Sequence, residues 1–71
     1  MENAECSILL NGAPHGVQPG IPLPELLAAL GLGAGTVLVE HNGRALFPKE
    51  WSEVHLHAGD RLEIIRVVAG G

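Results

Sequence analysis

Apolar residues recur at alternate positions in three segments of the chain, and this period is typical of half-buried β-strands. The segment at residues 7–17 contains Asn-Gly-Ala-Pro and predicts two strands joined by a turn. The segment at residues 36–46 contains Asn42-Gly43, the strongest hairpin signal in the sequence. The segment at residues 61–68 follows the turn residues His-Ala-Gly-Asp and predicts the last strand.

Between the first two of these segments, apolar residues recur with the period of an α-helix. Pro24 is tolerated in the first turn of a helix, because its missing N–H breaks no hydrogen bond there. Gly31 or Gly33 can adopt the left-handed conformation that ends a helix. We therefore expect one amphipathic helix over about residues 23–30. Four leucines form its apolar stripe: Leu23, Leu26, Leu27 and Leu30.

One main helix covers only one face of a sheet, so we expect an α+β fold with a mixed sheet of four to five strands. A short helical turn at residues 48–54 places Trp51 at the edge of the core. Alternation assigns one set of strand residues to the helix side and another to solvent. Exposed aliphatic residues that gather on one face are typical of an interaction surface. The predicted partner-binding surface consists of Leu9, Leu38, Ile65 and Val67.

Length and composition exclude several classes of function. The chain has 71 residues, and a chain this short buries only about 60% of its unfolded surface, so we expect a single domain over residues 1–71 without a deep cavity. The net charge is −4 and the four basic residues form no run, which argues against nucleic-acid binding. No segment approaches the ~20 apolar residues of a membrane helix. The start MENAECS lacks the features of a secretory signal, and the single cysteine fits a reducing compartment, so we expect a cytoplasmic location.

Few residues have the spacing of a catalytic or metal site. His55 and His57 would share one face of a strand, but a metal site needs three or four converging ligands, and His15 and His41 are distant in sequence. We expect no metal site, and we expect His41 to be partly buried with its hydrogen bonds satisfied. Cys6 has no basic neighbour that would activate it. No catalytic residue of its own is therefore expected.

The end of the chain offers a different chemistry. Glycine has no Cβ, so paired glycines let the backbone pass a narrow channel and leave the last carbonyl carbon open to attack. The residues from Val67 to Gly71 span at most about 17 Å when extended. We expect residues 67–71, which include Ala69 and Gly70, to be a flexible tail. Its last residue, Gly71, is the predicted reacting group.

Six motifs follow one another along the chain: LLNG, LPELLAALGL, VEHNG, FPKEW, GDRLEII and the final VVAGG. In this order they resemble the ubiquitin-like sulfur carriers with the β-grasp fold, and within them the sulfur carriers of thiamin biosynthesis. The likeness extends from Ser7 to Gly71. Pro22 departs from it, because the family usually has a hydroxyl residue as helix cap there. His41 also departs, because it replaces an aliphatic residue, and no role is assigned to the six residues before Ser7.

The resemblance implies a carrier that is not an enzyme and binds no cofactor. In the family, an E1-like adenylyltransferase uses ATP to adenylate the terminal carboxylate, here that of Gly71. Sulfur from a persulfide donor, a cysteine desulfurase or a rhodanese-like protein, then replaces AMP and leaves a thiocarboxylate. Thiazole synthase takes this sulfur to build the thiazole ring. Ile65 and Val67 occupy the place where the family's sheet face meets its partners, and Gly70 carries over as the second tail glycine.

Other assignments stay open at this point. The small subunit of molybdopterin synthase shares the fold and the Gly-Gly end, but it usually ends in a Pro-Pro-Val-x-Gly-Gly pattern and is longer. Carriers for cysteine synthesis or tRNA thiolation would use the same tail chemistry. A ubiquitin-like protein modifier would instead join Gly71 to a lysine. A plain interaction domain would make no use of the terminal glycines.

Overall fold

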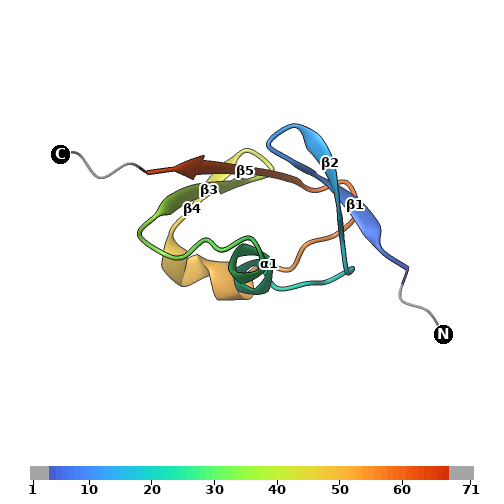
Figure 1. Cartoon of the computed structure of the whole chain (residues 1–71), viewed down its shortest axis with the longest axis horizontal. Helices are drawn as coiled ribbons and strands as arrows, with labels where there is room; N and C mark the ends of the chain where they lie inside the picture. The colour runs from blue at the N-terminus through green and yellow to red at the C-terminus, as the bar shows by residue number, and fades with distance from the viewer. Residues whose placement is uncertain (1–3, 68–71) are drawn as a thin grey trace.

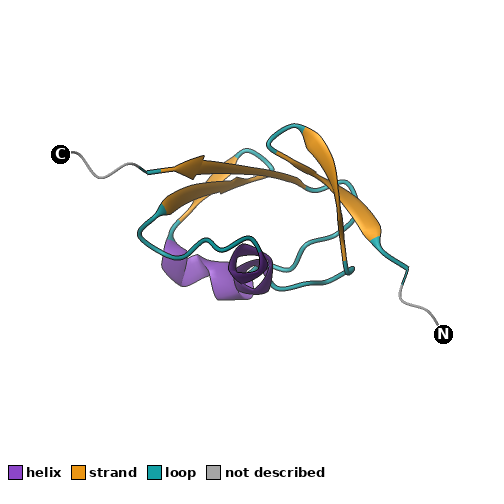
Figure 2. Ribbon diagram, in the orientation of Figure 1, coloured by secondary structure: helices purple, strands orange, loops and turns teal. Residues whose placement is uncertain are grey.

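The computed structural model describes residues 4–67, which form one sheet, one α-helix and one 3₁₀ helix (Figures 1 and 2). In this part of the chain, no helix is long and apolar enough to cross a membrane. The elements in chain order are β1 (Cys6–Leu10), β2 (Ala13–Val17), α1 (Leu23–Ala29), β3 (Val37–His41), β4 (Arg44–Leu46), η1 (Pro48–Glu53) and β5 (Arg61–Arg66).

The sheet has five strands in the order β2-β1-β5-β3-β4, so the strand nearest the C-terminus lies at its centre. β1 and β5 are parallel, and the other neighbouring strands are antiparallel, which gives the expected mixed sheet. Two hairpins supply the antiparallel outer pairs. In the first turn φ is 51° at Asn11 and 84° at Gly12, and in the second turn it is 52° at Asn42 and 86° at Gly43. Two positive φ values in a two-residue turn match the right-handed twist of the flanking strands, so both predicted turns are confirmed.

The core lies between one face of the sheet and the layer formed by α1 and η1 (Figure 2). The expected alternation holds on the strands, because Ile8, Val39 and Leu62 are almost fully buried, whereas Leu9 and Leu38 on the other face are exposed. Trp51 on η1 is also buried. The buried side chains are Ile8, Val17, Leu23, Leu26, Leu27, Val37, Val39, Leu46, Trp51, Leu56 and Leu62.

The helix is one residue shorter than the leucine spacing predicts. It ends at Ala29, and Leu30 is its C-cap with 36% of its surface exposed, so the fourth leucine does not join the buried stripe. Gly31 ends the helix at a φ of 76°, which confirms one of the two expected positions. At the other end, Pro22 provides no side-chain cap. This segment is held instead by backbone bonds, because the Leu23 N–H donates to the Val54 carbonyl at 2.9 Å.

Candidate functional site

The sheet face opposite α1 carries exposed apolar side chains beside the end of β5. Leu38 on β3 and Ile65 on β5 are direct cross-strand partners, and they are 60% and 52% exposed. The Val67 N–H donates to the Thr36 carbonyl at 2.8 Å, so the pairing continues past the end of β5. Val67 lies two positions beyond Ile65, on the same face, and is 44% exposed. These three residues of the predicted partner-binding surface therefore lie together.

Leu9, the fourth residue of that predicted surface, lies elsewhere on the face. It is 39% exposed, as the alternation predicts, but its partner in the sheet is Arg61 and not Ile65. Arg61 and Ile65 are four residues apart on one strand, which corresponds to about 13 Å. Alternation predicts the face on which a side chain lies, whereas its place along the neighbouring strand depends on the register. Leu9 is thus separate from the other three.

Phe47 belongs to this face, although the sequence pattern did not single it out. It is 68% exposed. Its backbone is extended, with φ −79° and ψ 150°, and it directly follows Leu46, which is paired with Val39. One further step in that register places Phe47 opposite Leu38. The two-residue turn at Asn42-Gly43 fixes the register of this hairpin, so counting outward from the turn could have identified Phe47. We call the set of Ile65, Leu38 and Phe47 the apolar row.

Two carboxylates face each other next to the apolar row. Glu40 on β3 and Glu63 on β5 are cross-strand partners, two positions along each strand from the pair of Leu38 and Ile65. They line a shallow hollow of about 150 Å³ together with Gly43 and Arg61. Within residues 4–67 the ion pairs are His41 with Asp60 and Arg44 with Glu50, so neither Glu40 nor Glu63 forms one. With two carboxylates and one guanidinium, the hollow has a net negative charge.

A hydrogen-bonded cluster connects the β3–β4 turn to the start of β5. Asp60 Oδ2 accepts from the His57 N–H at 3.0 Å and lies 3.0 Å from His41 Nε2, while Asn42 Nδ2 donates to Asp60 Oδ1 at 3.3 Å. Burial of Asp60 acts to raise its pKa, but the hydrogen bonds and the charge of His41 outweigh it and lower the pKa overall. His41 is half-buried with a partner, as predicted.

The remaining candidates for chemistry do not form a site in the described residues. His55 and His57 are exposed on either side of buried Leu56. Residues 4–67 contain no group of three or more histidine, cysteine or acidic residues that could hold a metal ion. Cys6 is a half-buried free thiol that packs against the core. His15 is the partner of Ile8 on the edge strand β2.

The predicted reacting group lies outside the described residues. Ala69, Gly70 and Gly71 belong to the segment 68–71, so the expectation of a flexible tail stays a prediction. β5 runs toward this end of the chain (Figure 1). In the sequence, the segment 68–71 therefore comes shortly after Ile65, the residue of the apolar row that lies on β5.

A family model and a solved structure indicate the same family. The model of the ThiS family matches residues 4–71. A solved structure, described as the thiamine biosynthesis protein (ThiS) from Geobacter metallireducens, superposes with a TM-score of 0.77 at 29% identity, covering 92% of this chain and 99% of that one. A thiazole synthase from Magnetococcus marinus is 34% identical over 64 residues, which are 90% of this chain. The chain spans only 20% of the length of that relative.

Proposed function

The chain belongs to the ThiS family, and we propose that it is a sulfur carrier of thiamin biosynthesis whose reacting group is the terminal carboxylate of Gly71. The observation that carries the proposal is the agreement of the family match over residues 4–71 with a solved ThiS structure of nearly the same extent. The five-stranded mixed sheet on one helix is the β-grasp fold of that structure. Small carriers of this kind are co-substrates of other enzymes and not catalysts themselves.

The proposed loading reaction follows from the chemistry of a carboxylate. Its carbonyl carbon is a poor electrophile until one oxygen becomes part of a good leaving group. An E1-like adenylyltransferase supplies this activation, because it joins the Gly71 carboxylate to AMP from ATP and releases pyrophosphate. A persulfide sulfur, from a cysteine desulfurase or a rhodanese-like protein, attacks the carbonyl carbon and AMP leaves. Cleavage of the sulfur–sulfur bond by a thiol then leaves the thiocarboxylate. The carrier itself needs no bound cofactor for these steps.

Thiazole synthase is the proposed acceptor of the sulfur. The relative from Magnetococcus marinus bears that name, and a stretch of it equal to 20% of its length is similar to this chain. A polypeptide that bears the name of thiazole synthase therefore contains a stretch similar to this carrier. This favours thiazole assembly as the pathway over molybdopterin synthesis, cysteine synthesis or tRNA thiolation. The cytoplasm, where ATP and the partner enzymes are present, is the proposed location.

Intact mass spectrometry tests the carrier chemistry. Protein expressed with the activating enzyme and the persulfide donor should gain about 16 Da, because sulfur replaces one oxygen. A variant that lacks Gly71 should fold normally, with an unchanged circular dichroism spectrum, and should not gain this mass. Glu25→Gln, a change on α1, should load like the wild type.

Two outcomes would contradict the proposal. Sulfur loading that persists without Gly71 would mean that another group reacts. Adducts of the chain on lysines of other proteins, with no thiocarboxylate, would favour the ubiquitin-like modifier instead.

A further inference from the structure

We propose that the turn at residues 33–36 positions the reacting end of the chain, because it holds Val67 and thereby sets where the free part of the tail begins. Thr36 is the positioning residue in this turn. The inference rests on the proposed function, because it concerns the delivery of the Gly71 carboxylate to the activating enzyme. It adds to that function a residue outside the tail whose side chain controls how efficiently the carboxylate is presented.

The turn leads from the helical segment into β3 and is closed by three hydrogen bonds between two residues. The Thr36 N–H donates to the Gly33 carbonyl at 3.1 Å, which is the bond of a β-turn. Gly35 has a φ of 88° at the third position, where a type II turn requires a positive value. The Thr36 hydroxyl donates to the Gly33 carbonyl at 2.5 Å and accepts the Gly33 N–H at 3.2 Å. The side chain of Thr36 therefore reinforces the backbone bond.

The backbone of Thr36 is also the point at which the ladder between β3 and β5 ends. The register places Thr36 opposite Val67, one step beyond the pair of Val37 and Arg66. The Val67 N–H donates to the Thr36 carbonyl at 2.8 Å. In a complete antiparallel pair of this kind the Thr36 N–H would donate back to the Val67 carbonyl, but here it donates to Gly33. The turn thus supplies the last bond of the ladder and withholds the next one.

On its other side, β5 is released earlier. In the part of the chain that the structure describes, the last bond on the β1 side runs from the Ile64 N–H to Asn11 Oδ1 at 2.7 Å. The residue pairs of β1 with β5 lie nearer the start of β5. Among the described residues, the bond from Val67 to Thr36 is therefore the one nearest the C-terminus (Figure 1).

This anchor determines how much of the chain a partner must order when it binds the tail. Four residues, 68–71, follow Val67 in the sequence, and they span at most about 14 Å. Fixing the backbone of one more residue weakens binding by about five- to thirtyfold. An enzyme that binds the tail does not have to order Val67, because the turn already holds it. The turn thus lowers the cost of binding by preorganisation.

The first test measures amide hydrogen exchange by NMR. Thr36→Val keeps the shape of the side chain and removes its hydroxyl group, whereas Thr36→Ser keeps the hydroxyl group. The Val67 amide should exchange about tenfold faster in Thr36→Val, because the two hydroxyl bonds of the turn are lost. The Ile64 amide, which Asn11 holds, should change by less than about twofold. Thr36→Ser should protect the Val67 amide like the wild type.

The second test measures adenylation of the same variants. Pyrophosphate release by the activating enzyme of the same organism, followed over a range of carrier concentrations with excess ATP, gives KM and kcat for the carrier. Thr36→Val should raise KM by about fivefold, because Val67 must then be ordered on binding. Its kcat should stay within about twofold, because this cost is the same in the bound ground state and in the transition state. Thr36→Ser should match the wild type in both constants.

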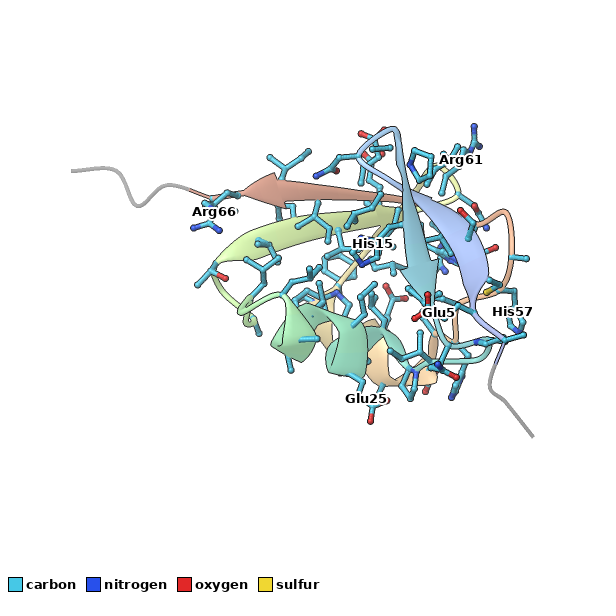
Figure 3. All side chains as sticks on the ribbon, turned by 45° about the vertical axis from the view of Figure 1, so that its right-hand side comes forward. Glu5, His15, Glu25, His57, Arg61 and Arg66 are labelled. Carbon is cyan, nitrogen blue, oxygen red and sulfur yellow. The ribbon has the colours of Figure 1, made fainter. Side chains whose placement is uncertain are left out.

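Two controls separate this effect from loss of a hydroxyl group or of stability elsewhere. Ser52→Ala removes an exposed hydroxyl group from η1. Val17→Ala leaves a cavity at a buried residue of β2 and should lower the melting temperature. Val17 pairs with Cys6, the neighbour of Glu5, and Figure 3 shows Glu5 and Arg66 toward opposite ends of the molecule. Both variants should keep KM within about twofold of the wild type.

The possible failures are distinguishable. Unchanged protection of the Val67 amide in Thr36→Val would overturn the anchor, and faster exchange with an unchanged KM would overturn its role in delivery; both results would leave the proposed function untouched. A KM that rises equally in Thr36→Ser or in Val17→Ala would also overturn the role of the Thr36 hydroxyl group. A wild-type chain that the activating enzyme does not adenylate would overturn the proposed function, and the positioning role with it.

Discussion

Replacing Asp60 by asparagine tests whether its charge holds the β3–β4 turn against the start of β5. The substitution keeps the size of the side chain and removes the negative charge. The carboxylate is 16% exposed and has three neighbours at hydrogen-bonding distance, His41 Nε2 at 3.0 Å, the His57 N–H at 3.0 Å and Asn42 Nδ2 at 3.3 Å. An asparagine has only one acceptor oxygen for the same donors. The change therefore weakens or removes each of these bonds.

The expected loss follows from these distances. Hydrogen bonds to a charged group contribute about 1.5–3 kcal/mol and neutral ones about 0.5–1.5 kcal/mol, so two short bonds and one long one would lose about 2–3 kcal/mol together. Asparagine is also easier to bury than a carboxylate, which offsets part of this loss. We expect the free energy of unfolding to fall by about 1–2 kcal/mol at neutral pH. A domain of this size has only about 4–10 kcal/mol of total stability, so the effect is measurable.

The direction of the Asp60 pKa shift determines how the stability difference between wild type and Asp60→Asn changes with pH. The pKa of Asp60 is lowered below its usual value in the folded protein. A lowered pKa means that the charged form contributes stability above the unfolded-state pKa, and that this contribution is lost as the pH falls through the folded-state pKa. The difference in stability between wild type and Asp60→Asn should therefore be full at about pH 5 and should shrink below about pH 4, where the wild-type carboxyl also becomes neutral.

Urea denaturation between about pH 5 and pH 2.5 measures this difference. Glu53→Gln is the control, because it removes the same charge from an exposed residue of η1 that forms no ion pair within residues 4–67. It should change the unfolding free energy by less than about 0.5 kcal/mol. Equal stability of Asp60→Asn and wild type at pH 5 would refute the reasoning. A difference that stays the same down to pH 2.5 would refute the assignment to the Asp60 charge.

Two further predictions concern local structure, and thermal unfolding measures both. Gly31→Ala should lower the free energy of unfolding by about 1 kcal/mol, because Gly31 has a φ of 76°. Gly33→Ala should be neutral or slightly stabilising, because Gly33 has no positive φ and no atom near the added methyl group. Equal losses in the two variants would refute the assigned role of the Gly31 conformation. Arg44→Ala should lower the free energy of unfolding by less than about 0.5 kcal/mol, because the Arg44 side chain is 70% exposed in its ion pair with Glu50. Glu50→Ala should lower it by about 1 kcal/mol. Glu50 also accepts the Phe47 N–H at 2.8 Å at the start of η1, so a larger loss for Arg44→Ala would contradict this role.

Local patterns predicted most of the elements of this fold. Both Asn-Gly turns and the termination at Gly31 lie where the sequence places them, because positive φ values are cheapest for glycine and asparagine. The helix stripe was right for Leu23, Leu26 and Leu27 but not for Leu30, which is 36% exposed. The period gives the direction of a side chain on a helix. It does not tell how closely the sheet packs on that side chain, and Leu30 borders an open groove that Leu10, Val37 and Ile64 of the sheet also line.

The candidate site was predicted only in part. The exposed positions of Leu38, Ile65 and Val67 follow from alternation alone. Phe47 was missed, although the register of its hairpin was accessible from the Asn42-Gly43 turn. The opposition of Glu40 and Glu63 was not accessible in this way, because β3 and β5 are separated in the chain by β4 and η1.

The sequence by itself determined the direction of each strand side chain, the two hairpin turns and the family. These features depend on steric rules that act over two to four residues, and on motifs that a family match recognises. Only the tertiary structure decided that β5 lies between β1 and β3, and hence that Ile65 pairs with Leu38 while Leu9 pairs with Arg61. Strands that are distant in the chain become neighbours through burial of the whole core. That choice depends on all the buried residues together, so no local pattern contains it.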